Sequence, residues 1–346
     1  MSMTQFLDAL ACKNRSRPPV WLMRQAGRYL PQYALLRKKY SLWQMFHEPE
    51  LSYQITRMPI DILGVDASIL FSDILVIVEA LGLQLAFPEG IGPVVTPSLQ
   101  KLEDVDNLPL LSVEETLGYV KKSIELFKKN SSSPLLGFCG GPFTVASYMI
   151  DRGERGNLSK TKQWLYRHPQ NFHTLLKKIT KATIAYLQMQ IDAGVNAIQI
   201  FDSWANVLPH PYLVEFSLSY LEEIINSVKK RNIPVIIFCR GASHFPDVLV
   251  PLKPTAISFD WHREMVNLRK HVPATIAVQG NLDPDILKTT PEIIRSCTLK
   301  ILDSMKEDSG FIFNLGHGVL PQTPVENVRC MVDTVKSYSP AGLRGH

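Results

Sequence analysis

The chain has 346 residues, and 45% of them are apolar, which is typical of a globular protein and excludes disordered and collagen-like classes. The 37 basic and 32 acidic side chains give a net charge of +5, which favours an anionic ligand but is too small to indicate a nucleic-acid partner. The five cysteines are far apart and include no C-x-x-C pair, so a disulfide framework and a zinc ribbon are both disfavoured.

The N-terminal stretch lacks the charged-then-apolar layout of a secretory signal. No segment is apolar for long enough to span a bilayer, because even the most apolar region, 67–87, contains Asp73 and Glu79. Together with the isolated cysteines, this predicts a cytoplasmic protein with no membrane partner.

Short apolar and β-branched runs recur along the whole chain. Eight of them are candidates for strands: 19–23, 67–72, 134–139, 197–201, 235–239, 256–260, 276–280 and 311–315. They are nearly continuous apolar runs and not alternating ones, which is typical of a parallel sheet that is buried on both faces.

Helical patterns lie between the apolar runs. Ser112 and Glu115 form a capping-box pattern, after which apolar residues mark one helix face up to the polar stretch at 128–133. Further helices are expected at 169–193, 211–230, 284–305 and 324–337.

This alternation predicts a single (β/α)8 TIM barrel over 1–346, with a short lead-in at about 1–17 and a long insertion after the second strand at about 74–111. The alternative is an open doubly wound sheet. No G-x-G-x-x-G follows the first strand and no P-loop motif exists, so nucleotide binding is not expected and the barrel is favoured.

A barrel carries its active site at the carboxyl ends of its strands, where this chain has many polar residues. No lysine ends a strand and no G-x-S-x-G is present, which disfavours Schiff-base and common serine-hydrolase chemistry. The strand-end residues are Arg24, Gln25, Arg28, Asp73, Gly140, Gly141, Asp202, Ser203, Arg240, Asp260, Asn281, Asp283 and His317, with Tyr148 beyond the third strand.

Arg24 and Arg28 are four residues apart, so in a helical turn both guanidinium groups would lie on one face and could each grip a carboxylate. The alternative is a pair of salt-bridged surface arginines. Asp73 lies in an almost wholly apolar run, where an unpaired carboxylate is costly. It must therefore meet a cation, a metal or several N–H donors, with a structural salt bridge as the alternative to a functional role.

Three other residues have both structural and functional interpretations. Tyr148 is either a core aromatic or a ligand contact, and Ser203 is either a helix cap or a substrate contact. His317 lies between two glycines, which allow close approach of a ligand, although a simple loop histidine is the alternative.

Asp202, Asp260 and Asp283 also follow strands. Their spacing is compatible with Mg²⁺ ligands or with a glycosidase carboxylate pair. We favour a third interpretation, in which they are salt-bridge partners for Arg240 and other basic residues.

Residues 19–31, PVWLMRQAGRYLP, closely resemble the N-terminal signature of the uroporphyrinogen decarboxylase family. The resemblance continues in chain order from about residue 4 to 338. The further matching segments are FSDIL at 71–75, GFCGGPFT at 137–144 with Tyr148, FDS at 201–203, QGNLDP at 279–284 and NLGHG at 314–318.

The resemblance implies a (β/α)8 barrel, usually homodimeric, that removes the four acetate carboxyl groups of uroporphyrinogen III as CO₂ and gives coproporphyrinogen III without metal or organic cofactor. Asp73, Arg24 and Arg28 would be catalytic. The implied substrate contacts are Arg24, Gln25, Ala26, Gly27, Arg28, Asp73, Tyr148, Ser203 and His317.

Some positions depart from the family pattern. Phe143 stands where Trp is common, Trp204 and Asn206 replace the usual residues after Ser203, and Arg240 stands where Lys is expected. These departures concern pocket details around the fourth and fifth strands.

Two other functions compete with decarboxylation. A zinc- and corrinoid-dependent methyltransferase of the same superfamily would need a His-x-Cys pair, but Ile237 precedes Cys239 and the glycine-rich loop carries His317 instead of Cys. A non-catalytic tetrapyrrole-binding protein would gain little from a lone buried carboxylate at Asp73.

Overall fold

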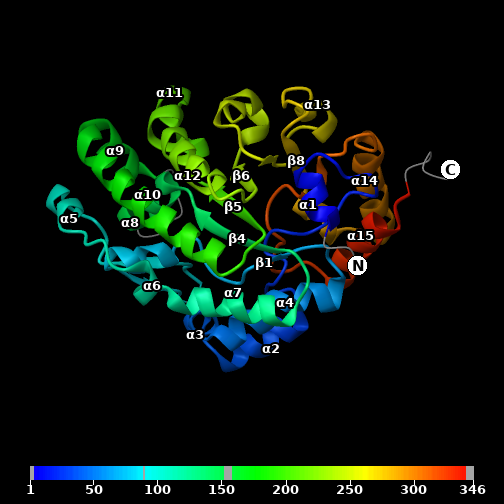
Figure 1. Ribbon diagram of the computed structural model, residues 1–346, viewed down its shortest axis with the longest axis horizontal. Helices are drawn as coiled ribbons and strands as arrows, with labels where there is room; N and C mark the ends of the chain where they lie inside the picture. The colour runs from blue at the N-terminus through cyan, green and yellow to red at the C-terminus, as the bar shows by residue number, and fades with distance from the viewer. Residues whose placement is uncertain (1–3, 89, 152–157, 340–346) are drawn as a thin grey trace.

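The computed structural model describes residues 4–88, 90–151 and 158–339, so residues 1–3 of the expected lead-in lie outside the described part. A curled sheet of parallel strands occupies the centre, with helices around its outside (Figure 1). Its seven strands follow the order β1 (Ser68–Ile69), β4 (Leu135–Gly140), β5 (Ala197–Asp202), β6 (Val235–Cys239), β7 (Ala256–Ser258), β8 (Ala277–Leu282) and β9 (Phe311–Leu315).

The run at 19–23 was expected to be an eighth strand, and the structure gives it only one parallel bridge, from Val20 to Phe313 of β9. The N–H of Phe313 donates to the carbonyl of Pro19 at 2.9 Å, and on the other side Asp66 N–H donates to the Val20 carbonyl at 2.8 Å. Pro18 and Pro19 have no N–H to give to a ladder, which is why pairing stops after one residue.

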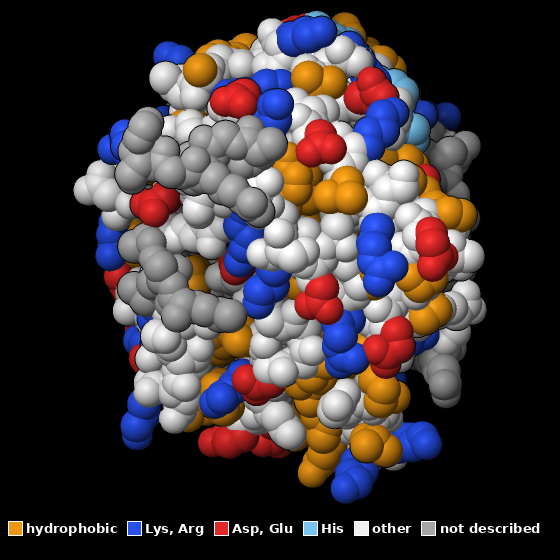
Figure 2. Space-filling model, turned by 90° about the vertical axis from the view of Figure 1, so that its right-hand side faces the viewer, with side chains coloured by type: hydrophobic (Ala, Val, Ile, Leu, Met, Phe, Trp, Pro, Cys, Tyr) orange, Lys and Arg blue, Asp and Glu red, His pale blue; other side chains and the backbone are white. Residues whose placement is uncertain are grey.

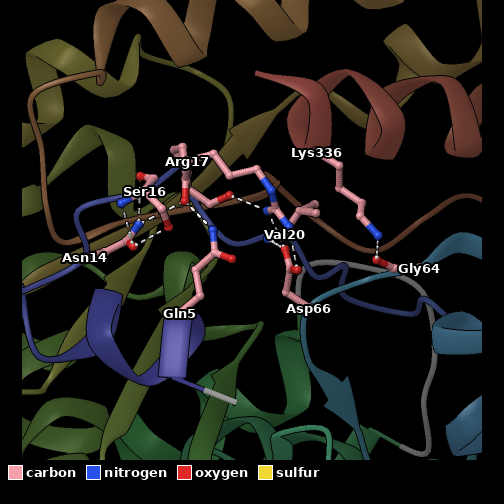
Figure 3. Close-up of polar contacts among 9 residues, drawn as sticks. Gln5, Asn14, Ser16, Arg17, Val20, Gly64, Asp66 and Lys336 are labelled. Carbon is pink, nitrogen blue, oxygen red and sulfur yellow. Dashed lines mark hydrogen bonds and ion pairs between the residues drawn. The ribbon is translucent and has the colours of Figure 1, made fainter. Parts of the chain in front are cut away.

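Side chains hold the 14–20 segment against the stretch before β1 (Figure 3). Arg17 forms two hydrogen bonds of 2.8 Å with the carboxylate of Asp66, and Val20 N–H donates to the same carboxylate at 2.8 Å. Near the other end of the chain, Lys336 Nζ donates to the carbonyl of Gly64 at 2.8 Å. The two ends of the chain are therefore tied to the same short region.

The longer helices pack on the outer face of the sheet. In sequence these are α4 (Pro49–Leu63), α7 (Gly118–Asn130), α8 (Pro142–Asp151), α9 (Ser159–Arg167), α10 (Pro169–Asp192), α12 (Ser219–Lys229), α14 (Pro291–Ser304) and α15 (Val325–Ser337). Contacts join α4 to α7, α7 to α10, α10 to α12 and α14 to α15, and α15 also contacts α4. The last helix thus lies beside one of the first (Figure 1).

Shorter helices fill the connections. They are α1 (Thr4–Leu10), α2 (Pro31–Lys39), α3 (Leu42–His47), α5 (Leu102–Asp106), α6 (Val113–Thr116), α11 (His210–Leu213) and α13 (Met265–Arg269). The connection after β1 also holds the 3₁₀ helix η1 (Val76–Leu81) and an antiparallel hairpin of β2 (Gln84–Ala86) and β3 (Val94–Thr96).

Three of the expected helices are interrupted. Ser112 accepts a hydrogen bond from Glu115 N–H at 3.4 Å, but the helix that it caps, α6, ends before Leu117, and α7 carries the apolar face. The expected helix at 211–230 contains a π-helical turn, Val214–Leu218, between α11 and α12. The one at 284–305 divides into the 3₁₀ helix Pro284–Lys288 and α14, where Pro291 starts a new helix.

The inner face of the sheet has its own core, which the lead-in helix completes. Phe6, Ala9 and Leu10 of α1 pack with small residues at the amino ends of the strands, such as Ala197 and Ala277. The next layer towards the carboxyl ends is polar and buried: Trp21 Nε1 donates to Gln279 at 2.9 Å, and Gln279 donates to Gln199 at 3.2 Å and Ser258 at 3.0 Å. This filled interior leaves space only above it, at the carboxyl ends.

The surface mixes charges of both signs. On the face in Figure 2, acidic and basic side chains are interspersed with apolar ones. All five cysteines are free. Among the described residues, no helix combines the length and the apolar character that crossing a bilayer requires.

Candidate active site

A cleft with a volume of about 280 Å³ opens at the carboxyl ends of the strands. Its polar lining includes six residues: Arg24, Gln25, Ser72, Asp73, Ser203 and His317. Five of these had been predicted from the sequence, and Ala26 also lines the cleft.

The apolar wall of the cleft is a row of aromatic rings from neighbouring strands. Phe138 of β4 lies 5.8 Å from Phe201 of β5, and Phe201 lies 6.2 Å from Phe238 of β6, between ring centroids. Phe238 in turn lies 5.9 Å from the imidazole of His317. Neighbouring rings stand at 66° to 78° to one another, so the row offers an apolar surface of ring edges and faces, with polar groups at the strand ends beside it.

The loop at 24–28 is not helical, so the prediction that Arg24 and Arg28 share one helix face is wrong. Arg24 has a left-handed φ of 57°, and its exposed side chain lines the cleft. Arg28 is exposed but lies outside the lining. Burial raises the pKa of Tyr33, a lining residue, and the charges of Arg37 and Arg28 lower it by less.

Gln25 braces this loop. Its side chain is 1% exposed, accepts from Leu22 N–H at 3.1 Å and donates to the Ala67 carbonyl at 3.2 Å. Tyr29 Oη donates to the Gln25 carbonyl at 2.5 Å. The backbone of Gly27 accepts from Leu30 N–H at 2.9 Å, so both residues support the shape of the loop that presents Arg24.

Asp73 is the carboxylate of the cleft, and within the described ranges it forms no ion pair. Its Oδ1 accepts from Leu75 N–H at 2.9 Å. Burial raises the pKa of Asp73, and the Leu75 N–H and the charge of Arg24 lower it by less. The structural salt bridge that was the alternative for Asp73 is therefore not what the structure has.

Tyr148, on α8, packs edge-to-face on Trp204 at 6.4 Å between centroids. Burial raises the pKa of its hydroxyl, on which the charges of Asp73 and Arg24 also act. Tyr148 is not part of the cleft lining. Ser203 follows β5 directly and does line the cleft.

His317 is partly buried at the end of β9. Burial and, to a smaller extent, the positive charges of Arg24 and Arg240 lower its pKa to about 4, and the charge of Asp260 opposes them. At neutral pH the imidazole is therefore uncharged and can donate one hydrogen bond and accept another.

Among the described residues, none of the three strand-end aspartates pairs with Arg240 as expected, and Asp260 pairs with another basic residue, His262. Asp202 accepts from the hydroxyls of Thr144 and Ser217, each at 2.5 Å. Asp283 caps the following turn through Asp285 N–H at 3.0 Å.

Asp260 accepts from Ser243 and from His262 Nδ1, the latter at 2.6 Å. Burial alone would raise the pKa of Asp260, but these hydrogen bonds outweigh burial and lower it. In the part of the chain that the structure describes, no three His, Cys, Asp or Glu side chains are grouped to hold a metal ion.

Sequence reasoning missed the lining residues that come from helices. Tyr33 of α2, with Leu42 and Phe46 of α3, covers the cleft from outside the sheet. The barrel prediction points to strand ends alone. In the sequence of a short helix, an apolar residue that lines a cleft looks the same as one that packs in the core.

Comparisons with known proteins identify the family. The family model described as uroporphyrinogen decarboxylase (URO-D) matches residues 1–338. A protein of that name from Protochlamydia amoebophila is 49% identical over 96% of this chain and 91% of its own length, and one from Vesicomyosocius okutanii is 40% identical over 96% and 98%.

A solved structure, a methyltransferase from Methanosarcina mazei, shares the fold with a TM-score of 0.80 at 19% identity, covering 96% of this chain and 98% of its own. At that identity the likeness extends to the fold alone, whereas the family model and the two relatives match nearly the whole sequence. This chain belongs to the uroporphyrinogen decarboxylase family.

Proposed function

We propose that this protein decarboxylates uroporphyrinogen III to coproporphyrinogen III, releasing four CO₂. The observation that carries the proposal is Asp73, a carboxylate that faces the cleft and has no ion pair within the described residues. Such a group is costly for the fold, and a substrate with N–H donors and a developing positive charge would satisfy it.

The substrate supplies its own electron sink. When a pyrrole is protonated on a ring carbon it becomes an iminium-like cation, which accepts the electron pair left by the departing CO₂. A second protonation, at the carbon that lost CO₂, leaves a methyl group, and loss of the proton first added to the ring carbon restores the pyrrole, so one proton is consumed for each CO₂ released. Asp73 accepts hydrogen bonds from the pyrrole N–H groups and stabilises the cation as it forms.

The remaining polar residues hold carboxylate arms. Arg24 grips an acetate or propionate through two hydrogen bonds, and Arg28 approaches from the same loop. Neutral His317 donates one hydrogen bond without adding charge, and Ser203 and Tyr148 donate from their hydroxyls. The aromatic row of Phe138, Phe201 and Phe238 packs against the macrocycle.

Several finer features belong to the same proposal. Segment 19–23 acts as the eighth member of a closed single-domain barrel, supported by its hydrogen bonds to β9 and to Asp66. The enzyme works as a homodimer in the cytoplasm, where five free cysteines suit a reducing compartment.

The test is a product assay. The purified protein, treated with a chelator, is incubated anaerobically with uroporphyrinogen III, and the products are oxidised and separated by carboxylate number. We expect stepwise seven-, six-, five- and four-carboxylate porphyrins. Unchanged substrate from folded protein, beside a working enzyme of the same family, would contradict the proposal, and thiol methylation and porphyrin binding would then be measured.

A further inference from the structure

The turn directly after β6 carries an exposed basic side chain, Arg240, next but one to Phe238 of the cleft lining and outside the lining itself. Strands β5 and β6 are paired in register, with Phe201 opposite Phe238, and both rings line the cleft. Side chains two residues apart along a strand point to the same face. Ser203, two residues after Phe201, does line the cleft, and Arg240 has the corresponding place after Phe238.

No carboxylate of the described residues neutralises the charge of Arg240. This arginine is exposed, and among the residues described it forms no ion pair. The strand-end carboxylates beside it are already occupied: Asp202 by Thr144 and Ser217, and Asp260 by Ser243 and His262. An exposed cation in the turn after a cleft-lining strand is thus left available for an anionic ligand.

The positions of Arg240 and Arg24 in the sheet are far apart. In one direction across the sheet, β6 is followed by β7, β8 and β9, and β9 pairs with Val20. In the other direction it is followed by β5, β4 and β1, and Asp66, just before β1, donates a hydrogen bond to Val20. β6 is therefore the strand farthest from the segment that leads into Arg24. The charges of both arginines nevertheless lower the pKa of His317, which lines the cleft.

We propose that Arg240 binds a carboxylate of the substrate on the side of the cleft away from Arg24, and so contributes to selection of highly carboxylated substrates. The inference rests on the proposed function and adds a binding residue to it. A planar guanidinium can hold a carboxylate through two parallel hydrogen bonds, which an ammonium cannot do in the same geometry. Gly241, with a left-handed φ of 79°, turns the chain sharply after Arg240.

The experiment compares Arg240→Gln and Arg240→Lys with a matched control, Arg295→Gln, which removes an exposed arginine from α14 away from the cleft. Steady-state kinetics are measured with uroporphyrinogen III. We expect Arg240→Gln to raise KM about tenfold or more, as loss of a charge-assisted hydrogen bond would, with little change in kcat. Arg240→Lys restores part of the affinity, and Arg295→Gln leaves KM unchanged.

Binding of the stable octacarboxylate uroporphyrin III and the tetracarboxylate coproporphyrin III is measured in parallel. We expect Arg240→Gln to weaken the octacarboxylate more. An unchanged KM in an active, folded Arg240→Gln protein would overturn the inference. If the wild-type protein failed to decarboxylate, the proposed function would fall separately, and equal binding of uroporphyrin III by wild type and Arg240→Gln would then overturn the role of Arg240.

Discussion

Replacing Asp73 by Asn separates the charge of this residue from its shape. Asn keeps an oxygen for the 2.9 Å hydrogen bond from Leu75 N–H, so the local backbone is retained. A cation that forms about 5 Å from a carboxylate, at an effective dielectric constant of about 20, is stabilised by about 3 kcal/mol. Losing that stabilisation only in the transition state should lower kcat on the order of 100-fold.

The same substitution should not weaken the fold. Burial raises the pKa of Asp73, so its contribution to stability is present below the unfolded-state pKa and is lost as the pH rises through the folded-state pKa. At pH 7 the burial of this carboxyl group therefore costs the native state stability. We expect Asp73→Asn to unfold at the same or a higher temperature than wild type at pH 7, and the difference to vanish below the ordinary pKa of aspartate.

Asp104→Asn is the matched control. Asp104 accepts from the N–H groups of Gln100 at 2.7 Å and Lys101 at 2.9 Å, and these hydrogen bonds lower its pKa. Its loss should lower stability at pH 7 and leave turnover unchanged. Near-normal turnover by Asp73→Asn would remove Asp73 from the mechanism, and destabilisation of Asp73→Asn as large as that of the control would refute the reasoning from burial.

Three further predictions concern the loop, the chain ends and the imidazole. A Cβ on Gly318 would lie 2.5 to 3.1 Å from three carbons of Arg24, so Gly318→Ala should displace that arginine and lower kcat/KM about tenfold, and kinetics within twofold of wild type would contradict this contact. Asp66→Ala should lower the free energy of unfolding in urea by about 2–3 kcal/mol, because it breaks a forked, largely buried ion pair, whereas Asp61→Ala, at an exposed pair, should cost less than about 0.5 kcal/mol. An NMR titration should give His317 a pKa of about 4, and its contribution to stability should be lost as the pH falls from 6.5 towards 4; a midpoint near 6.5 would refute its burial.

Local sequence patterns determined most of the elements. The runs at 235–239 and 311–315 coincide with β6 and β9, and those at 134–139 and 197–201 match β4 and β5 to within a residue. A continuous apolar run is itself the requirement for a strand covered on both faces, so no information from distant residues was needed. Because parallel strands end together, the same patterns also grouped Arg24, Asp73, Ser203 and His317 at one edge.

Tertiary structure alone decided how those elements pair and which partners their polar side chains have. The run at 19–23 looks like a strand, but the prolines before it and the Asp66 carboxylate on its N–H leave it with one bridge. Asp202 and Asp260 are bound by hydroxyls and an imidazole, which leaves Arg240 without an ion-pair partner in the part of the chain that the structure describes. A polar group takes whichever donors the fold brings within about 3 Å, and those donors come from segments whose spacing along the chain carries no periodic signal.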